Sequence, residues 1–339
     1  MKKFWFLLPG LMVAQIPEKI IFDTDSGFFG DDGAALVMLL QQPAKVKILG
    51  ITVVAGNVRA TQGAEYMFRI LTLMKRTDVP LYLGAQAPLV HTADMAAAAA
   101  VRWGKQEFTG AFSESGAVKR LTPLKPQSQN AVDFIIETVD RNPGQVTLFA
   151  IGPMTNIAMA LRLRPDLAIR MKRVVFMGGN VHVPGNVTKA AEFNFWFDPE
   201  AAQVVLRSEI ANKVMFGLDI CNRAQVHKRQ FDEIIAVKNP ITDLYKEDLG
   251  NVYPGFFKNA DAVSYMWDAL AAAYLIDSGF VTKSESASLD VDSRFSASYG
   301  AVMPLDKQLA PRATPVQAML DLDFKRVFTL YKKSLQLVN

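Results

Sequence analysis

Cysteine and histidine are almost absent from this chain of 339 residues. Cys221 is the only cysteine, and the three histidines, His91, His182 and His227, lie far apart in the sequence. A single cysteine cannot form an intrachain disulfide, so cysteine usage does not indicate a redox compartment. Histidines this scattered do not match the spacing of a zinc motif. The two scarcities exclude a disulfide framework and a histidine-based metal site.

Long blocks of one charge are also missing. The 37 basic and 33 acidic residues give a net charge of +4, and no extended basic run occurs. A groove for nucleic acid is therefore not indicated, and we expect a small-molecule partner. No internal repeat and no linker divides the chain.

The one apolar run near the start of the sequence is too short to span a bilayer. Lys2 and Lys3 precede an apolar stretch over residues 4–14, whereas a spanning helix needs about 20 apolar residues. A short apolar run behind a basic start is typical of a signal peptide. We therefore expect residues 1–15 to direct export, to the periplasm or outside the cell. The alternative is an ordinary apolar lead-in to the first strand of a cytoplasmic protein.

What the sequence does contain is an alternation of strand-like and helix-like segments. Strands are predicted at residues 20–22, 47–56, 79–84, 146–152, 173–179, 213–219, 289–291 and 316–322, and helices at 60–75, 131–141, 154–163, 199–208 and 324–337. Such alternation predicts an α/β protein with an open, mostly parallel sheet covered by helices on both faces. We expect one domain over residues 16–339. Residues 85–129 lack periodicity and are expected to form a lid or binding loop.

Four aspartates stand between the first strand and the helical pattern that follows it. Asp23, Asp25, Asp31 and Asp32 fall within ten residues, at the end of the sheet where open α/β proteins bind ligands. Carboxylates this close repel one another unless a cation neutralises them, and a hard metal ion that prefers oxygen ligands is the simplest resolution. The alternative is that they are ordinary turn and helix-cap residues.

Polar groups follow other strands or interrupt apolar helices. Asn57 comes directly after a predicted strand, and the segments 151–156 and 177–180 begin at the ends of two others. Asp268 lies in an otherwise apolar helical pattern over 264–277, where a buried acid needs a partner such as a cation. Asn186, Glu192 and Asn194 precede a helix start, and amides with an acid suit the recognition of hydroxyl groups.

Taken together, these segments resemble the nucleoside hydrolases, which cleave the N-glycosidic bond of ribonucleosides. The resemblance runs from residue 19 nearly to the C-terminus, and its motifs are DTD with the following DD, ITVVAGN, GPMTNIAMA, VVFMGGN, the GN and AEFN pair before FDPEAA, and WDA. It implies a Rossmann-like fold, a bound Ca²⁺ and a homodimer or homotetramer. Trp267 stands before the metal aspartate, where the broad-specificity branch carries a histidine, so the closest likeness is to the purine-specific inosine-adenosine-guanosine branch.

The resemblance also implies roles for single residues. Asp25 would be calcium ligand and general base, and the other ligands would be Asp32, Asp268 and the main-chain oxygen of Ile151. The ribose and base would be held by Asp31, Asn57, Asn186, Glu192, Asn194, Trp267 and Trp103, while Asp23 would support the cluster from behind. Between Asp25 and Asp31 this chain has five residues where the family usually has three, so Phe28 or Phe29 either projects over the nucleoside or folds back onto the protein.

The implied reaction is attack on the anomeric carbon by a water that Asp25 deprotonates. No titratable group adjoins Trp267, which favours activation of a purine by stacking between aromatic rings. Three alternatives remain open: a broad-specificity or pyrimidine nucleoside hydrolase, a haloacid-type phosphatase with its Asp-x-Asp start, and a nucleoside-binding protein without activity.

Overall fold

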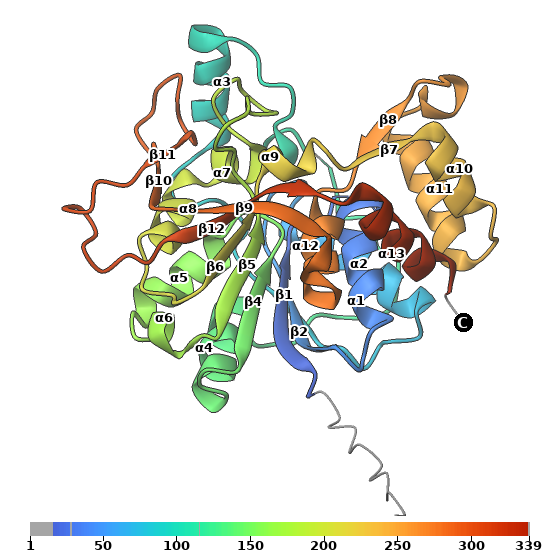
Figure 1. The fold of residues 1–339 in the computed structure, drawn as a ribbon, viewed down its shortest axis with the longest axis horizontal. Helices are drawn as coiled ribbons and strands as arrows, with labels where there is room; N and C mark the ends of the chain where they lie inside the picture. The colour runs from blue at the N-terminus through green and yellow to red at the C-terminus, as the bar shows by residue number, and fades with distance from the viewer. Residues whose placement is uncertain (1–15, 28, 115, 338–339) are drawn as a thin grey trace, which may run out of the picture.

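The fold is built on one eight-stranded sheet. The computed structural model describes residues 16–27, 29–114 and 116–337, so the predicted signal peptide over 1–15 lies outside the described residues. The strand order is β3-β2-β1-β4-β5-β6-β12-β9, and every neighbouring pair is parallel except β12 and β9. Figure 1 shows the sheet with helices packed around it. The predicted α/β class with a mostly parallel sheet is confirmed.

The sheet strands are β1 (Glu18–Thr24), β2 (Val46–Val53), β3 (Leu81–Leu83), β4 (Val146–Ala150), β5 (Arg173–Met177), β6 (Lys213–Phe216), β9 (Val281–Ala287) and β12 (Val316–Leu322). The α-helices are α1 (Ala34–Leu40), α2 (Ala60–Leu73), α3 (Ala93–Trp103), α4 (Ala131–Arg141), α5 (Thr155–Leu163), α6 (Leu167–Arg170), α7 (Phe193–Phe197), α8 (Pro199–Leu206), α9 (Leu218–Cys221), α10 (Lys228–Ile235), α11 (Pro240–Val252), α12 (Asp268–Ile276) and α13 (Phe324–Gln336). Two short antiparallel sheets of two strands each, β7 (Gln225–His227) with β8 (Val263–Tyr265) and β10 (Leu289–Val291) with β11 (Val302–Pro304), lie outside the main sheet.

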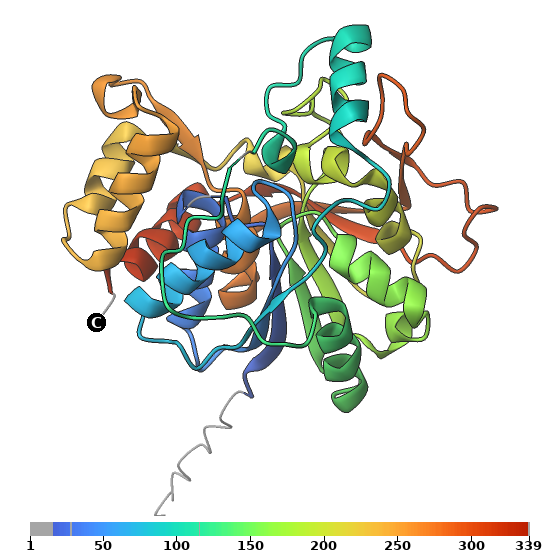
Figure 2. The ribbon, with the colours of Figure 1, turned by 180° about the vertical axis from the view of Figure 1, so that it is seen from behind.

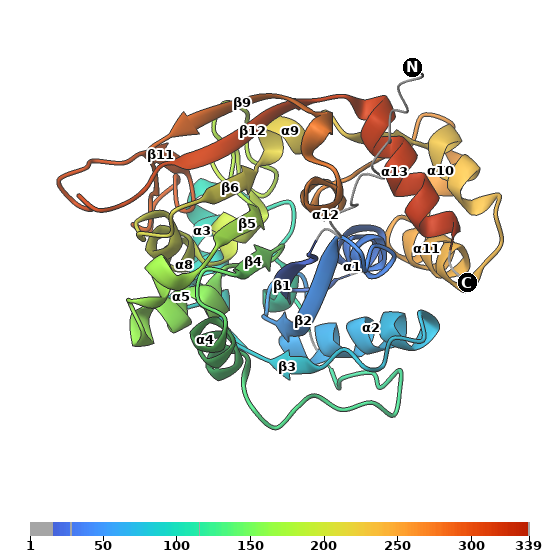
Figure 3. The ribbon, with the colours of Figure 1, turned by 60° about the horizontal axis from the view of Figure 1, so that its bottom comes forward.

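Strand β1 is buried on both faces, which explains its continuous apolar sequence. Ile20 and Phe22 point into a core shared with α1, α2, α12 and α13, whereas Ile21 points into a second core shared with α4, α5 and α8. Figure 3 shows these two groups of helices on opposite sides of the strands. Alternate side chains of one strand thus hold both helical layers.

The order in which strands are added to the sheet changes direction between β1 and β4. From β1 the chain builds outward through β2 and β3, then returns to place β4 on the other side of β1. Crossovers that leave a sheet in opposite directions open a crevice at the carboxyl ends of the two strands. The aspartates after β1 begin at this crevice.

The structure adds two features that the sequence pattern did not predict. Helix α3 occupies part of 85–129, where a loop was expected, and it stands above the sheet in Figure 2. Helices α10 and α11, with the two-stranded β7–β8 sheet, form a lobe beside α13. Among the described residues, no helix is both long and apolar enough to cross a membrane.

Candidate active site

Asp23, the last residue but one of β1, connects β1 to two other elements through hydrogen bonds. Its Oδ2 accepts hydrogen bonds from Thr52 Oγ1 at 2.5 Å, on β2, and from Asn156 Nδ2 at 2.8 Å, on α5. Complete burial raises the pKa of Asp23 to about 7. The carboxyl group fixes the base of the crevice, as expected of a supporting residue.

Asp25 lies next in the crevice and is fully buried. Its Oδ2 accepts the Asn57 N–H at 2.7 Å, and the Asn57 side-chain amide lies 3.3 Å from Oδ1. A Cβ atom on Gly56 would stand 2.1 Å from Asp25 Oδ2, and one on Gly152 would stand 2.8 Å from Asp25 Cβ, so both neighbours must be glycine. Burial, together with the nearby charge of Asp32, raises the pKa of Asp25 well above its usual range.

Asp31 and Asp32 are carried by a π-helical turn, η1 (Phe29–Gly33), that leads into α1. Thr24 Oγ1 donates a hydrogen bond to Asp32 Oδ1, and Asp31 Oδ1 accepts the Asp268 N–H at 3.0 Å. This last bond joins η1 to the start of α12, more than two hundred residues later. One oxygen from each of Asp31, Asp32 and Asp268 lies within 4.8 Å of the others.

These three carboxyl groups fit a hard cation. Among the described residues, Asp32 Oδ2, Asp268 Oδ2 and Asn194 Oδ1 are buried without a hydrogen-bond partner. Burial raises the pKa of Asp31 to about 7 and of Asp32 to about 6, and it raises that of Asp268 well above its usual range. Unpaired, buried oxygens that repel one another are stabilised by a metal ion with oxygen ligands, such as Ca²⁺ or Mg²⁺.

The converging group differs in one member from the ligand set implied by resemblance. Asp31, which was assigned to the sugar, belongs to the converging group, whereas Asp25 does not. Ile151 lies at the end of β4 with its N–H bound to Asp23 O, and its carbonyl is 3.5 Å from Asn194 Nδ2. The assignments of Asp25 and Ile151 to the metal stay predictions.

Glu192 and Asn194 begin helix α7 beside this group. The Glu192 carboxylate accepts the N–H groups of Gly179 at 2.7 Å, Asn194 at 2.9 Å and Phe195 at 3.2 Å. It therefore caps the helix, although burial raises its pKa to about 7. Asn194 Nδ2 donates to Met177 O at 3.1 Å, and Asn186 Oδ1 accepts the Phe193 N–H at 3.0 Å.

Sequence reasoning missed the two side chains that hold the loop carrying Asn186. Asn180 Nδ2 donates to Val183 O at 2.8 Å and Ala190 O at 3.2 Å, and its Oδ1 accepts the Glu192 N–H at 3.0 Å. Asp219, on α9, accepts the N–H groups of residues 181 and 182 at 2.8 and 2.7 Å. The MGGN motif drew attention to Asn180 only through its glycines, and nothing in the sequence marked Asp219.

The two tryptophans expected at the base lie in different surroundings. Trp267, directly before α12, is half-buried and stacks on Tyr265 with ring centroids 5.3 Å apart. Trp103, at the end of α3, packs edge to face on Phe295 at 5.1 Å and lines a separate cavity that none of the cluster aspartates reaches. No contact among the described residues brings Trp103 to the aspartates.

The lengthened loop after Asp25 turns toward the protein. Phe29 is 2% exposed, its ring lies 5.5 Å from that of Tyr245, and its N–H donates to Asp248 Oδ2 at 3.0 Å. Of the two alternatives for this residue, the structure selects the one in which it folds back, here onto α11. Phe28 lies outside the described residues.

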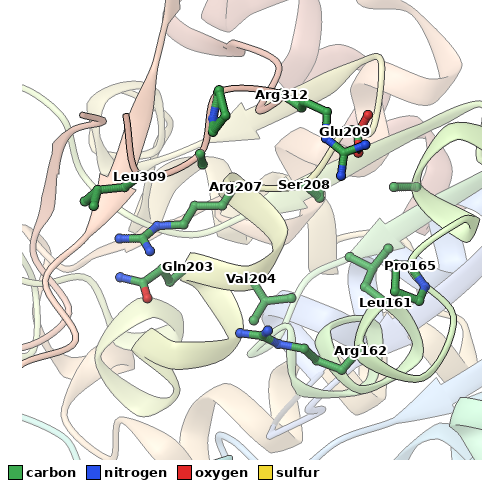
Figure 4. Close-up of a pocket in the computed structure, with 13 residues that line it drawn as sticks. Leu161, Arg162, Pro165, Gln203, Val204, Arg207, Ser208, Glu209, Leu309 and Arg312 are labelled. Carbon is green, nitrogen blue, oxygen red and sulfur yellow. The ribbon is translucent and has the colours of Figure 1, made fainter. Parts of the chain in front are cut away.

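Another hollow, of about 510 Å³, lies between α5, α8 and residues 309–312 (Figure 4). Its arginines include Arg207 and Arg312, which already pair with Asp290 and Glu209. None of the cluster aspartates lines it.

Comparison with known proteins shows which family the sequence resembles. The family model described as inosine-uridine preferring nucleoside hydrolase matches residues 20–329. The pyrimidine-specific ribonucleoside hydrolase RihA of Salmonella arizonae is 36% identical over 228 residues, which are 67% of this chain and 69% of the relative.

Solved structures of similar fold cover almost the whole chain. A purine-preferring ribonucleoside hydrolase from Gardnerella vaginalis is 24% identical with a TM-score of 0.75, over 94% of this chain and 98% of that one. An inosine-guanosine nucleoside hydrolase is 24% identical with a TM-score of 0.77, over 95% and 99%. Because the family model spans nearly all of the described residues and the aspartates converge at the crevice, the chain belongs to the inosine-uridine preferring nucleoside hydrolase family.

Proposed function

We propose that this nucleoside hydrolase is calcium-dependent, prefers purine ribonucleosides, and uses Asp25 as its general base. The observation that carries the proposal is the group of buried aspartates whose oxygens converge. Some of these oxygens lack hydrogen-bond partners among the described residues. A set made only of oxygen donors suits Ca²⁺, which takes six to eight such ligands. Asp31, Asp32 and Asp268 would hold the ion, together with Asp25 and the Ile151 carbonyl if they complete the shell.

Asp25 is built to accept a proton in a fixed orientation. The Asn57 N–H and the two glycine contacts hold its carboxylate in one position, which orients it to take a proton from an attacking water. When bound, the ion would polarise the attacking water and the ribose hydroxyls. Attack by one water with no carboxylate nucleophile predicts inversion at the anomeric carbon.

The remaining polar side chains would bind and orient the ribose. Asp31 and Asn194 would hold the 2′ and 3′ hydroxyls, and Asn186 with Glu192 would hold the 5′ hydroxyl. Asn194 Oδ1 is buried and unpaired among the described residues, so a hydroxyl donor would satisfy it. The carboxylates around the sugar would also stabilise the positive charge that develops on an oxocarbenium-like transition state.

The purine preference rests on Trp267. Trp267 comes directly before Asp268 in the sequence, and its ring stacks on Tyr265. An aromatic face can stack on a purine and ease protonation of a ring nitrogen, which substitutes for a side-chain acid. Pyrimidine specificity is the second candidate, because the Salmonella relative is a pyrimidine-specific enzyme. A homodimer or homotetramer and export remain predictions.

The test is release of reducing sugar from inosine, adenosine, guanosine, uridine and cytidine, with and without a calcium chelator. We expect the purine nucleosides to have the higher kcat/KM, and chelation to abolish activity until Ca²⁺ is restored. Higher kcat/KM for uridine and cytidine would select the pyrimidine alternative. Release of phosphate from p-nitrophenyl phosphate, or inosine binding without turnover, would indicate the phosphatase or the silent binding protein.

Asp25→Asn tests the general base with little change of shape. We expect kcat to fall by at least about a hundredfold, since a positioned base contributes typically 10²–10⁴-fold. Asp243→Asn, on α11, is the matched control and should keep full activity. Full activity in Asp25→Asn would refute the assignment.

A further inference from the structure

The turn over residues 56–59, between β2 and α2, carries Asn57 against Asp25 with little room to move. The Asn57 N–H donates to Asp25 Oδ2 at 2.7 Å. A Cβ atom on Gly27 would stand only 2.6 Å from Asn57 Cβ, so the turn is confined from that side as well. A shift of the turn would change the hydrogen bond to Asp25. Whatever holds the turn from outside therefore also holds that bond.

A segment much later in the chain packs against one end of this turn. It is a short 3₁₀ turn, η2 (Gly110–Phe112), and its Ala111 N–H donates to Gly56 O at 2.8 Å. Gly110 has a φ of +54°, and a Cβ atom there would stand 2.2 Å from Gly56 O, so the close approach requires glycine. The last residue of η2 stacks on Phe197 with ring centroids 4.6 Å apart, which fixes η2 on the body of the protein.

Glu114, two residues after η2, holds the other end of the turn. Its Oε2 accepts the main-chain N–H of Arg59 at 2.6 Å and lies 3.5 Å from Arg59 Nε. Arg59 directly precedes α2, and an arginine side chain has no acceptor with which to cap a helix. Gln62 stands where a capping side chain would reach back, but its amide binds the main chain of Lys119 with both its oxygen and its nitrogen. The acceptor at this helix start therefore comes from Glu114.

The surroundings of Glu114 keep its carboxylate in place. Only 21% of its side chain is exposed, and a hydrogen bond to an ionised acceptor is roughly twice as strong as one between neutral groups. Arg59 Nε is buried and makes no hydrogen bond among the described residues, so the nearby carboxylate balances its charge. The chain then continues along the outside of α2 and β3 (Figure 3), where the Leu121 N–H donates to Glu65 Oε2 at 2.9 Å.

We propose that Glu114 is a positioning residue for catalysis, which closes the turn over residues 56–59 from outside. By this closure it keeps the Asn57 N–H on the Asp25 carboxylate. η2 fixes one end of the turn and Glu114 the other, so the turn is clamped at both ends. The catalytic consequence rests on the proposed role of Asp25 as general base, whereas the clamp itself does not.

The first experiment measures hydrogen exchange of the Asn57 main-chain amide by NMR of the full chain. We expect Glu114→Ala to raise the exchange rate at least about tenfold, because the turn loses a bond to a charged acceptor. Glu114→Gln keeps a carbonyl oxygen for the Arg59 N–H and should stay within about twofold of the wild-type rate. Glu247→Ala removes an acid that pairs with Arg69 of α2, and as the matched control it should leave the rate unchanged. Unchanged exchange in Glu114→Ala would overturn the proposal.

The second experiment measures kcat for the nucleoside that is hydrolysed fastest, in the same variants and in an Asp25→Asn background. Glu114→Ala should lower kcat about tenfold, since a misplacement of about 1 Å can cost roughly a hundredfold, and Glu114→Gln should restore it. In the Asp25→Asn background Glu114→Ala should cause no further loss, because both changes remove the same function. A tenfold loss in both backgrounds would contradict the proposal.

Glu114→Asp separates the position of the oxygen from its charge. It keeps the charge but is one methylene too short for the Arg59 N–H, so exchange and kcat should follow Glu114→Ala, even if that variant folds poorly. Wild-type values in Glu114→Asp would show that charge alone acts, and the positioning role would be wrong. Full activity in Asp25→Asn would refute the general base instead, and the exchange rates would still decide whether Glu114 clamps the turn.

Discussion

Removing divalent cations should destabilise the folded protein itself, apart from any loss of activity. Asp25, Asp32 and Asp268 are at most 2% exposed, and Asp31 is 9% exposed. All four have raised pKa values because they are buried and close together. The folded state without a cation therefore contains carboxyl groups that either repel one another or must take up protons.

The size of the effect follows from mass action. With a dissociation constant of about 1 µM, 1 mM Ca²⁺ stabilises the folded state by about 4 kcal/mol. Unfolding a chain of 339 residues has an entropy of about 0.7 kcal/mol/K, taking about 2.1 cal/mol/K per residue. The midpoint of thermal unfolding should therefore rise by about 6 °C when Ca²⁺ is added to chelator-treated protein.

The assay is thermal unfolding measured by calorimetry, on the wild-type protein and on two variants. Asp268→Ala should lose the calcium-dependent shift. Asp198→Asn changes a buried carboxyl that caps α8 and lies outside the converging group, so its midpoint should fall while the shift remains. An unchanged midpoint in the wild-type protein, or the same shift in Asp268→Ala, would refute the assignment of the cluster to a cation.

Three further predictions concern residues around the site and in the core. Asn180→Ala removes three hydrogen bonds that close the loop over 180–192, so KM for inosine should rise about tenfold while KM for 5′-deoxyinosine changes little; equal losses for both substrates would show a general effect. His91 has a pKa of about 4 in the folded protein, against 6.5 in the unfolded chain, so between these values the unfolded chain binds one more proton. The free energy of unfolding should therefore fall by about 3 kcal/mol as the pH is lowered from 6.5 to 4. Urea unfolding of His91→Leu should lack this loss. Lys213 donates to three main-chain carbonyls, and Lys213→Met should cost about 3 kcal/mol in the same measurement.

The placement of the aspartates was predictable because local sequence determined it. An apolar run fixes β1, and the parallel sheet places whatever follows β1 at its carboxyl edge. Asp268 could be connected to the cluster because an acid in an apolar helix requires a partner. The strand order that puts β1 beside β4 creates the crevice, and the alternation of strands and helices predicts this class of sheet without giving the order itself.

Other features depend on contacts between distant segments. The middle of helix α3 is an alanine run, and alanines carry no hydrophobic periodicity that would mark one face of a helix. The direction of Trp103 is set by Phe295, nearly two hundred residues later, so its position in a long segment after β3 could not indicate which cavity it lines. The capping role of Glu192 and the hydrogen bonds that Asp219 accepts from residues 181 and 182 likewise depend on the folded loop.

The loop that the resemblance implies to be longer leaves the aspartates of the cluster together. A π-helical turn contains one more residue than an α-helical turn, so η1 takes up part of the added length while the chain still enters α1. Phe29 anchors that turn in the core through Tyr245 and Asp248 of α11. Asp31 and Asp32 therefore still lie beside Asp268. The same anchor joins α11 to the turn that carries two of the converging carboxylates.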